Sequence, residues 1–329
     1  MAKKKYSQST INYFARRKER RLLEELKKGE DLISEMQVYY QDAVSDIGDD
    51  IAKLFGKYVD DNNLTIEEAN KYLTGNEFKT WRKGMKDYLN EIELLGDTKE
   101  AEALLLELNT LAMRSRISRL EGLQYSIKAN MAHIGTIEES KIEELLMNVG
   151  NNAYYKEMYD LYLSGDKKVL EKMVTGNVRI DSRKVAKIVN MNWSGANYSK
   201  NIWDKKYEIS RKIEKAVASA IVGGTSPQKL ISQITKETDL TLRKNVSTLV
   251  RTEISHVVSE MDYNTYSELG LDEYRISGTL DNRTSTICQY QDGKIYKLSE
   301  KETGKNYPPF HPNCRSVAVA VTEYDDLNT

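Results

Sequence analysis

The stretch that decides the fold class runs from Ile33 to Tyr58 and reads ISEMQVYYQDAVSDIGDDIAKLFGKY. Its apolar side chains recur at alternating steps of three and four residues, so they share one stripe of an α-helix. These side chains are Ile33, Met36, Tyr40, Val44, Ile47, Ile51, Leu54 and Tyr58. Helical spacing continues to about residue 190, and no proline interrupts it. The sequence therefore predicts an elongated helical N-terminal region over residues 1–190.

Local signals predict where helices begin and end in this region. Thr65 to Glu68 and Thr136 to Glu139 both read TIEE. This is the pattern of a capping box, in which the threonine and the second glutamate satisfy each other's backbone amides, so each predicts a helix start. Glycines such as Gly29, Gly135 and Gly165 are predicted at helix ends, because glycine readily adopts the left-handed backbone found there.

Residues 191–329 begin with further helical signals. Pro227 stands where a proline suits the first turn of a helix, and Arg243 to Leu269 carry an apolar face. That face consists of Val246, Val250, Ile254, Val257 and Met261. A helix is therefore predicted over Arg243 to Leu269.

After Gly270 the chain changes to short alternating segments. EYRISGTLD, GKIYKL and RSVAVAVTEY predict strands, joined by turns at Asp281-Asn282 and Asp292-Gly293. The predicted fold class is mainly α, in which the helical region is followed by a small α+β C-terminal domain. The predicted domains are residues 1–190 and 191–329.

Composition limits the function classes. The 329 residues are 40% hydrophobic and carry a formal net charge of −1, so the whole chain lacks the positive charge that attracts DNA. No apolar run approaches the ~18 residues of a spanning helix, so no membrane segment is predicted. The basic start, MAKKKYSQST, is not followed by an apolar segment, which argues against a secretory signal. Two cysteines are too few for a disulfide framework and favour a reducing compartment.

A cluster of metal-ligand residue types lies near the C-terminus. His311 and Cys314 form an H-x-x-C knuckle within NYPPFHPNCRS, and Cys288 precedes His311 by 23 residues. Zinc prefers thiolate and imidazole ligands in a tetrahedral set, so these three residues are candidate zinc ligands. A structural zinc site needs four ligands, and Asp281, Asp292, His256 or water are candidates for the fourth.

Two other interpretations of this cluster stay open. The cysteines can pack as small hydrophobic side chains while His311 is hydrogen-bonded in a proline-stiffened loop. A disulfide between Cys288 and Cys314 is disfavoured by a reducing compartment. Because only three ligands are visible, the sequence favours the loop without metal, and no cofactor other than zinc is indicated.

Four stretches give the C-terminal half a resemblance to a known family. WSGANYSKNIW (193–203), LVRTEISHV (249–257), DNRTSTICQYQDGKIY (281–296) and PPFHPNCRS (308–316) occur in the order found in the head-morphogenesis family of tailed bacteriophages. These proteins are similar to Mu F protein, and the resemblance covers about residues 190–322. The positions matching the motifs are Arg251, Glu253, Asp281, Arg283, Asp292, Gly293 and His311 to Arg315. Many members carry cysteine where Ser285 stands, and often where Ser316 stands.

The resemblance implies a minor head protein of low copy number, not an enzyme. Such proteins join the capsid during assembly, at the portal or the inner capsid surface, and some are thought to leave with the DNA. The implied partners are the portal protein and a major capsid or scaffold protein. The implied location is the host cytoplasm during assembly and then the interior of the virion.

An enzyme is the main alternative class. A metal-dependent nuclease could use His311, Asp281 and the knuckle, but such a site needs several carboxylates or histidines in one pocket. The chain has three histidines in all. Arg251 and Glu253 are two residues apart on a predicted helix and do not share a face. Arg251 is therefore interpreted as a buried or half-buried anchor, paired with Asp281 through a forked guanidinium contact.

The basic N-terminus is a candidate contact for DNA or for a protein partner. Its cations include Lys3, Lys4, Lys5, Arg16, Arg17, Arg20 and Arg21. A helix from Ile11 to Leu26 would turn its apolar residues inward and its basic residues outward, and such a stripe can neutralise phosphates without reading sequence. The alternatives are a solvated helix face or a docking surface for an acidic portal or capsid protein.

Overall fold

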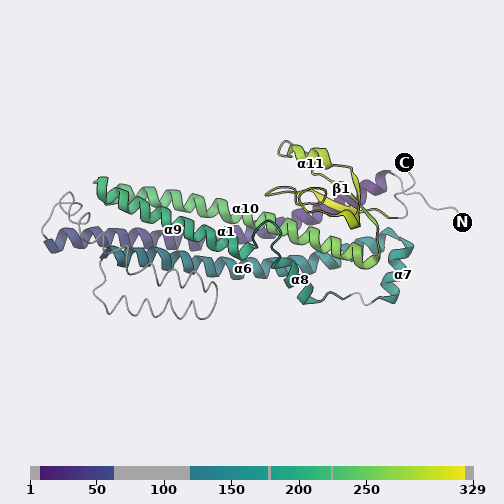
Figure 1. The fold of residues 1–329 in the computed structure, drawn as a ribbon, viewed down its shortest axis with the longest axis horizontal. Helices are drawn as coiled ribbons and strands as arrows, with labels where there is room; N and C mark the ends of the chain where they lie inside the picture. Colours follow the sequence, from purple (N-terminus) through teal and green to yellow (C-terminus); the bar gives the residue numbers. More distant parts are fainter. Residues whose placement is uncertain (1–7, 63–118, 177–178, 224, 323–329) are drawn as a thin grey trace. The chain divides into compact units, whose positions relative to one another are not determined.

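The computed structural model describes residues 8–62, 119–176, 179–223 and 225–322, and this part of the chain is mainly α, as predicted (Figure 1). Its helices are α1 (Gln8–Asn62), α6 (Arg119–Ser164), α7 (Lys167–Thr175), α8 (Ser182–Val189), α9 (Tyr198–Gly223), α10 (Pro227–Leu269) and α11 (Thr286–Gln291). Two predictions, the capping box at Thr65 to Glu68 and the stripe side chains of Leu54 and Tyr58, lie outside what the structure describes.

The chain divides into two compact units, and each is built from separated segments. The helical unit comprises residues 35–139 and 202–245, and the sheet-containing unit comprises residues 1–34, 140–201 and 246–329. Helices α1, α6, α9 and α10 each contribute residues to both. The boundary predicted at residue 190 concerns independent folding and stays a prediction.

In the described part of the helical unit, segments of α1, α6, α9 and α10 bury apolar stripes. From α1, the predicted stripe residues Met36, Tyr40, Val44, Ile47 and Ile51 are at most 1% exposed. The Thr136 to Glu139 capping box is wrong, because these residues lie in the middle of α6. Glu138 is instead buried, accepting a hydrogen bond from Tyr40 Oη at 2.8 Å and pairing with Lys206. Gly135 is likewise inside α6, beside the Trp203 ring, and not at a helix end.

The sheet-containing unit holds three antiparallel strands in the order β2-β1-β3. These are β1 (Glu273–Ser277), β2 (Ile295–Lys297) and β3 (Val317–Ala320), one in each predicted segment. Tyr274 on β1 is opposite Tyr296 on β2 and Ala320 on β3. The short helix α11, between β1 and β2, was not predicted.

The predicted apolar face of α10 is confirmed and lines the core of the sheet-containing unit. Val246, Val250, Ile254, Val257 and Met261 are all at most 1% exposed. In the sheet-containing unit, Tyr266 on the same helix donates a hydrogen bond from its hydroxyl to the carbonyl of Ala318 at 2.9 Å. This bond fixes β3 against the last turns of α10.

Two glycines of α6 provide a matched test of this packing. A Cβ at Gly150 would lie 2.6 Å from Val185 Cγ1, and valine is stiff at χ1. We expect Gly150→Ala to lower the free energy of unfolding by about 1–3 kcal/mol through overpacking. Among the described residues, no atom outside the adjoining backbone of α6 lies within 4 Å of a Cβ at Gly122. Gly122→Ala should therefore raise the free energy of unfolding by up to about 1 kcal/mol. Urea unfolding measures both, and equal effects would contradict the close approach of α8 to α6.

Candidate functional site

Trp193 connects the first family-like motif to the second. Its indole ring stacks on the imidazole of His256, with ring centroids 4.4 Å apart and an interplanar angle of 9°. Its Nε1 donates a hydrogen bond to Glu253 Oε2 at 3.1 Å. Glu253 and His256 are 2% and 0% exposed, so both motifs meet in the protein interior.

Helix α10 then holds the knuckle of the fourth motif. The backbone amide of Asn313 donates to Thr252 Oγ1 at 3.0 Å, and Ser255 Oγ donates to the carbonyl of Cys314 at 2.7 Å. Asn313 has a φ of 60°, a left-handed conformation that asparagine tolerates better than most residues. One polar face of α10 therefore shapes the loop that carries His311 and Cys314.

Arg315 connects the fourth motif to the third. Its two terminal nitrogens lie 2.8 and 2.7 Å from the two carboxylate oxygens of Asp281. Asp281 also accepts a hydrogen bond from the Arg283 amide at 2.9 Å. The hydrogen bonds from Arg315 and Arg283 hold the pKa of Asp281 well below its usual range. Arg283 itself is exposed.

The predicted pair between Arg251 and Asp281 is wrong. Arg251 Nε lies 2.6 Å from Glu30 Oε1 on α1, and its side chain is 41% exposed. Arg251 and Glu253 point to different partners, as their spacing on one helix predicts. Arg251 was assigned the wrong carboxylate because the sequence gives no sign that α1 lies beside α10.

Asp292 and Gly293 form the predicted turn, which lies between α11 and β2. Asp292 Oδ1 accepts a hydrogen bond from the Gly278 amide at 2.8 Å. Gly293 has a φ of +78° and donates its amide to the Ile276 carbonyl at 2.9 Å. These two hydrogen bonds hold the turn against the end of β1, immediately before the chain enters β2.

Cys288, His311 and Cys314, the three candidate zinc ligands, converge. Cys288 Sγ is 3.2 Å from His311 Nε2 and 3.8 Å from Cys314 Sγ. All three ligand atoms lie within 4.8 Å of one another. Hydrogen bonding from Cys314, aided by Ser285, Ser316 and His311, lowers the pKa of Cys288 to about 4. The same bond to Cys288, together with burial, raises the pKa of Cys314.

The two distances from Cys288 Sγ, 3.2 and 3.8 Å, are close to those between ligands of one zinc ion. Tetrahedral ligands at 2.0–2.3 Å from a common ion lie roughly 3.3–3.8 Å apart. Zinc held there would be a structural crosslink between α11 and the knuckle. Among the described residues, the group includes no fourth histidine, cysteine or carboxylate.

The protein candidates for a fourth ligand each have another role. Arg315 binds Asp281, and Gly278 binds Asp292. His256 lies in the stack with Trp193. These three assignments are therefore corrected. The side chains that remain beside Cys288 are the hydroxyls of Ser285 and Ser316, which are weaker zinc ligands than a thiolate.

A cysteine substitution tests whether the fourth ligand limits metal binding. We expect the natural chain to retain well under one equivalent of zinc after gel filtration, because thiolate is absent from the fourth corner. Ser285→Cys should raise retention to near one equivalent. Thr286→Cys adds a thiol at the neighbouring, exposed position and should leave it unchanged. Elemental analysis measures all three proteins, and full zinc occupancy of the natural chain would contradict this expectation.

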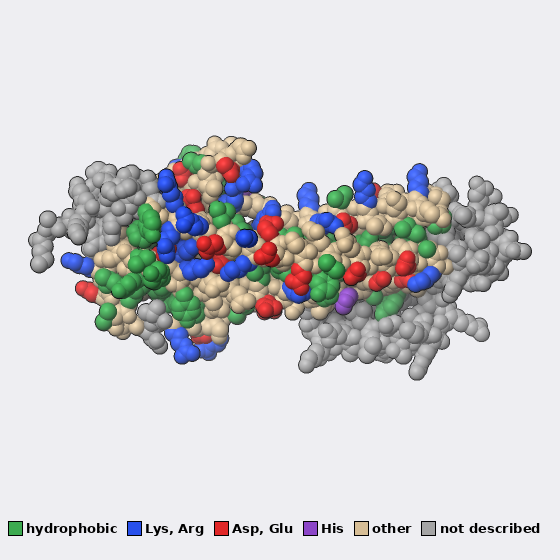
Figure 2. All heavy atoms as spheres, turned by 180° about the vertical axis from the view of Figure 1, so that it is seen from behind, with side chains coloured by type: hydrophobic (Ala, Val, Ile, Leu, Met, Phe, Trp, Pro, Cys, Tyr) green, Lys and Arg blue, Asp and Glu red, His purple; other side chains and the backbone are tan. Residues whose placement is uncertain are grey.

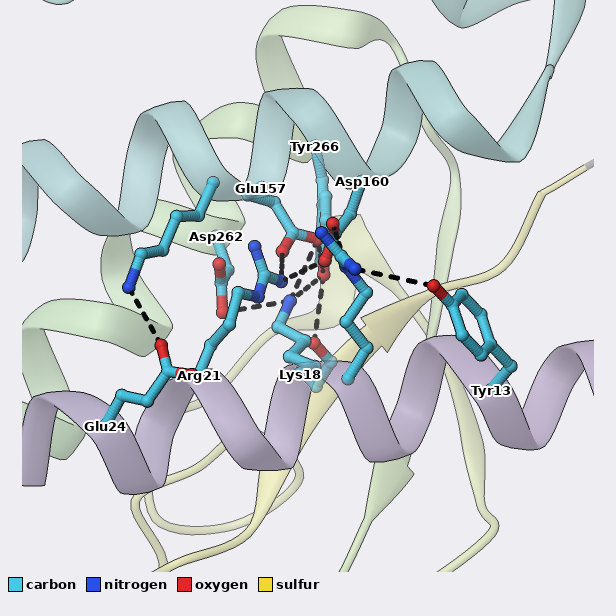
Figure 3. A network of polar contacts seen from close by, with 11 residues as sticks. Tyr13, Lys18, Arg21, Glu24, Glu157, Asp160, Asp262 and Tyr266 are labelled. Atoms are coloured by element: carbon cyan, nitrogen blue, oxygen red, sulfur yellow. Dashed lines mark hydrogen bonds and ion pairs between the residues drawn. The ribbon is translucent and has the colours of Figure 1, made fainter.

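Part of the basic N-terminal stripe faces inward. Lys18 is 3% exposed, with its Nζ 3.0 Å from Glu157 Oε1 and 2.9 Å from Asp262 Oδ2. Figure 3 shows Lys18 and Arg21 reaching from α1 to Glu157 and Asp160 on α6 and to Asp262 on α10. Arg17 also pairs with Asp160. The helix from Ile11 to Leu26 was predicted to turn all its basic residues outward, and this is wrong for Lys18 and Arg21, while Arg17 is only partly exposed.

In this buried charge cluster, the neighbouring cations oppose the effect of burial on the pKa of each carboxylate. Burial alone would raise the pKa of Glu157, but the charges of Lys18 and Arg21 overcome it and lower the value to about 2. Burial raises the pKa of Asp262 to about 7, although Lys18 opposes the shift. Glu157 contacts both Lys18 and Arg21.

Arg16 and Arg20 remain exposed on α1, whereas Lys3, Lys4 and Lys5 lie outside the described residues. Tyrosines on α6 are exposed nearby, since the Arg17 guanidinium lies 5.8 Å from the ring centre of Tyr159. Figure 2 shows lysine and arginine side chains gathered beside hydrophobic ones on one face of the molecule. No helix in the described part of the chain is long and apolar enough to cross a membrane.

Comparisons with known proteins agree with the motifs. Residues 211–319 match the family model described as Phage Mu protein F like protein. An uncharacterized protein of Haemophilus influenzae is 26% identical over 115 residues, which are 35% of this chain and 26% of that protein. The match thus spans about a quarter of that relative's length. No solved structure matches the chain. Over residues 211–319 this chain is similar to the Mu F-like family, as its motifs predicted, and the likeness points to phage head morphogenesis.

Proposed function

We propose that this protein is a minor head protein of a tailed bacteriophage, present in few copies and without catalytic activity. It joins the head during assembly in the host cytoplasm and then lies in the capsid interior. Its partners are the portal protein and a major capsid or scaffold protein. The family match over residues 211–319 supports the head role.

One observation favours a structural role over a catalytic one. The polar residues of the motifs bind one another: Asp281 binds Arg315, Glu253 binds Trp193, and Asp292 binds the Gly278 amide. Activating water on a phosphodiester requires carboxylates or histidines that converge on a metal in an open pocket. Polar residues that bind other segments of the same chain are suited to stabilising a region with little regular secondary structure.

Head association is tested in the phage that encodes the protein. Quantitative mass spectrometry of purified virions should find it at far fewer copies than the major capsid protein. Deletion of its gene should reduce the yield of infectious particles, and the gene supplied in trans should restore it. Absence from both virions and assembly intermediates would contradict the proposal.

Catalytic activity is tested separately. Incubation with plasmid DNA and Mg²⁺, Mn²⁺ or Zn²⁺ should leave the DNA intact. DNA cleavage that disappears in His311→Ala but persists in Arg283→Ala, an exposed control, would favour the nuclease.

A DNA-binding protein that is ejected with the genome is the second candidate. The exposed Arg16 and Arg20 favour it, since surface cations can neutralise phosphates. Charge reversal is a cleaner test than removal of residues 1–28, because Lys18 and Arg21 are needed inside the fold. A salt-sensitive DNA shift that Arg16→Glu with Arg20→Glu abolishes, and that Arg283→Glu retains, would support this candidate.

A further inference from the structure

We infer that Cys288 and Cys314 form a thiol–disulfide site, which a small peroxide oxidises to an intramolecular disulfide. The two sulfur atoms are 3.8 Å apart in the reduced protein. A disulfide bond is about 2.05 Å long, so the sulfurs must approach by less than 2 Å. The inference concerns this chain's own thiols and does not depend on the proposed head function.

The surrounding structure brings the two cysteines together without a bond between them. Cys288 lies in α11, where its backbone amide donates a hydrogen bond to Ser285 Oγ at 3.3 Å. Cys314 lies in the knuckle, and its carbonyl is held by Ser255 of α10 at 2.7 Å. Because the knuckle precedes β3 and has no regular secondary structure, side-chain rotation and a small loop shift can close the remaining gap.

Because both sulfur atoms are buried, only a small oxidant can reach them, and a disulfide between two protein molecules is excluded. Cys288 and Cys314 are 3% and 0% exposed. A second protein molecule cannot reach a sulfur in that position, whereas a peroxide is little larger than water. The neighbouring loop residues Pro312 and Asn313 are exposed, so the site lies close to solvent.

His311 is placed to accept the proton of the attacking thiol. Its Nδ1 lies 2.8 Å from the carbonyl oxygen of Pro312, and a carbonyl only accepts, so Nδ1 carries the ring hydrogen. Nε2 is then the acceptor nitrogen, and it lies 3.2 Å from Cys288 Sγ. This arrangement makes Cys288 the attacking sulfur and Cys314 the resolving sulfur.

The reaction has two steps. In the first, the Cys288 sulfur attacks one peroxide oxygen, the O–O bond breaks, and a sulfenic acid forms. The departing hydroxide takes the proton that His311 had accepted and leaves as water. In the second, Cys314 attacks the Cys288 sulfur, the S–O bond breaks, and hydroxide leaves with the Cys314 proton as a second water. Two thiols and one hydrogen peroxide give one disulfide and two waters, and the thiols supply both electrons.

The disulfide would close the chain between residues 288 and 314, which includes β2 and the knuckle. It would also remove both thiolates from the candidate zinc site. In the proposed setting, a protein made in a reducing cytoplasm later resides in a particle outside the cell, where thiol reductants are scarce. Oxidation would then fix the same loop that α10 holds by hydrogen bonds.

The test treats the full chain, after chelator removes metal, with a small excess of hydrogen peroxide. Intact mass should fall by two hydrogen atoms, both thiols should disappear from a denaturing thiol assay, and dithiothreitol should restore them. Non-reducing electrophoresis should show only monomer. The melting midpoint should rise by roughly 5–10 °C, as expected for closing a loop of this length.

Variants identify the roles of the two sulfurs. Cys314→Ser should gain oxygen atoms at Cys288 and form no disulfide, because the resolving thiol is missing. His311→Ala should slow the reaction of the natural pair without changing its product. A natural chain that gains oxygen, forms dimers or keeps both thiols would overturn the inference, whatever the folding state of the variants.

Discussion

Replacing Lys18 with methionine is expected to lower the free energy of unfolding by about 3–5 kcal/mol. The side chain of Lys18 is 3% exposed and contacts Glu157, Asp262 and Tyr266. Methionine has a similar length but no charge, so two carboxylates would be left buried without their shared cation. Removing one partner of a buried ion pair costs far more than the pair itself contributes, because the other partner stays desolvated.

Urea unfolding monitored by circular dichroism measures this loss. Lys28 on the same helix is the matched control, because it pairs with Glu25 but its side chain is 45% exposed. Lys28→Met should change the free energy of unfolding by less than about 0.5 kcal/mol. Adding Asp262→Asn to Lys18→Met should recover part of the loss by removing one unpaired charge. If Lys18→Met and Lys28→Met behave alike, the buried cluster does not form in solution.

The apolar features of this fold could be predicted from the sequence because periodicity is a local property. The stripe at Met36 to Ile51 and the face of α10 follow from spacing alone, and both are buried. Glycine was a poor guide in α6, since Gly135 and Gly150 permit close packing inside the helix and do not end it. Gly29 is likewise inside α1 and not at a helix end, whereas Gly165, with a φ of +72°, has the expected left-handed backbone after α6.

Charged contacts between distant segments were the part that the sequence did not reveal. Lys18 and Glu157 are 139 residues apart, and no spacing rule relates them. A weaker signal was present, because Glu157 lies at helical spacing among Ala153, Tyr154, Met158 and Leu161, all of which are buried. A charged residue inside an apolar stripe indicates a buried partner of opposite charge, although the partner's identity has to come from the structure.

The convergence of Cys288, His311 and Cys314 could be predicted because the flanking strands had to pair. β1 and β3 do pair, at Ser277 with Val317, and this brings the knuckle beside α11. Between them, Val317 is buried, while Ile287 and Val319 are only half-buried. The roles of Thr252 and Ser255 were missed, since hydroxyls that bind a loop backbone leave no pattern in the sequence.

Glu253→Gln and His256→Phe are expected to change the pH dependence of stability in opposite directions. Burial raises the pKa of Glu253 from 4.5 to about 7, although its hydrogen bond from Trp193 opposes the shift. Between these values the folded state keeps a proton that the unfolded state has lost. Glu253 therefore makes stability fall as pH rises from about 4.5 to about 7.

His256 has the reverse effect over an overlapping range. Burial lowers its pKa from 6.5 to about 3, with a smaller contribution from the charge of Lys301. Neither ring nitrogen has a hydrogen-bond partner among the described residues, which agrees with a neutral ring. Between pH 3 and pH 6.5 the unfolded state holds the extra proton, so His256 makes stability rise with pH.

Between about pH 4.5 and pH 6.5, the contributions of Glu253 and His256 to the change of stability with pH have opposite signs in the natural chain. Glu253→Gln leaves the His256 slope alone, so its stability relative to the natural chain should rise by about 2–3 kcal/mol across that range. His256→Phe keeps an aromatic ring against Trp193. Its stability relative to the natural chain should fall by a similar amount across the same pH range. Urea unfolding at three pH values measures these differences, and groups common to all three proteins cancel. Parallel curves would mean that Glu253 and His256 titrate in the folded protein as they do in water, which their burial against Trp193 argues against.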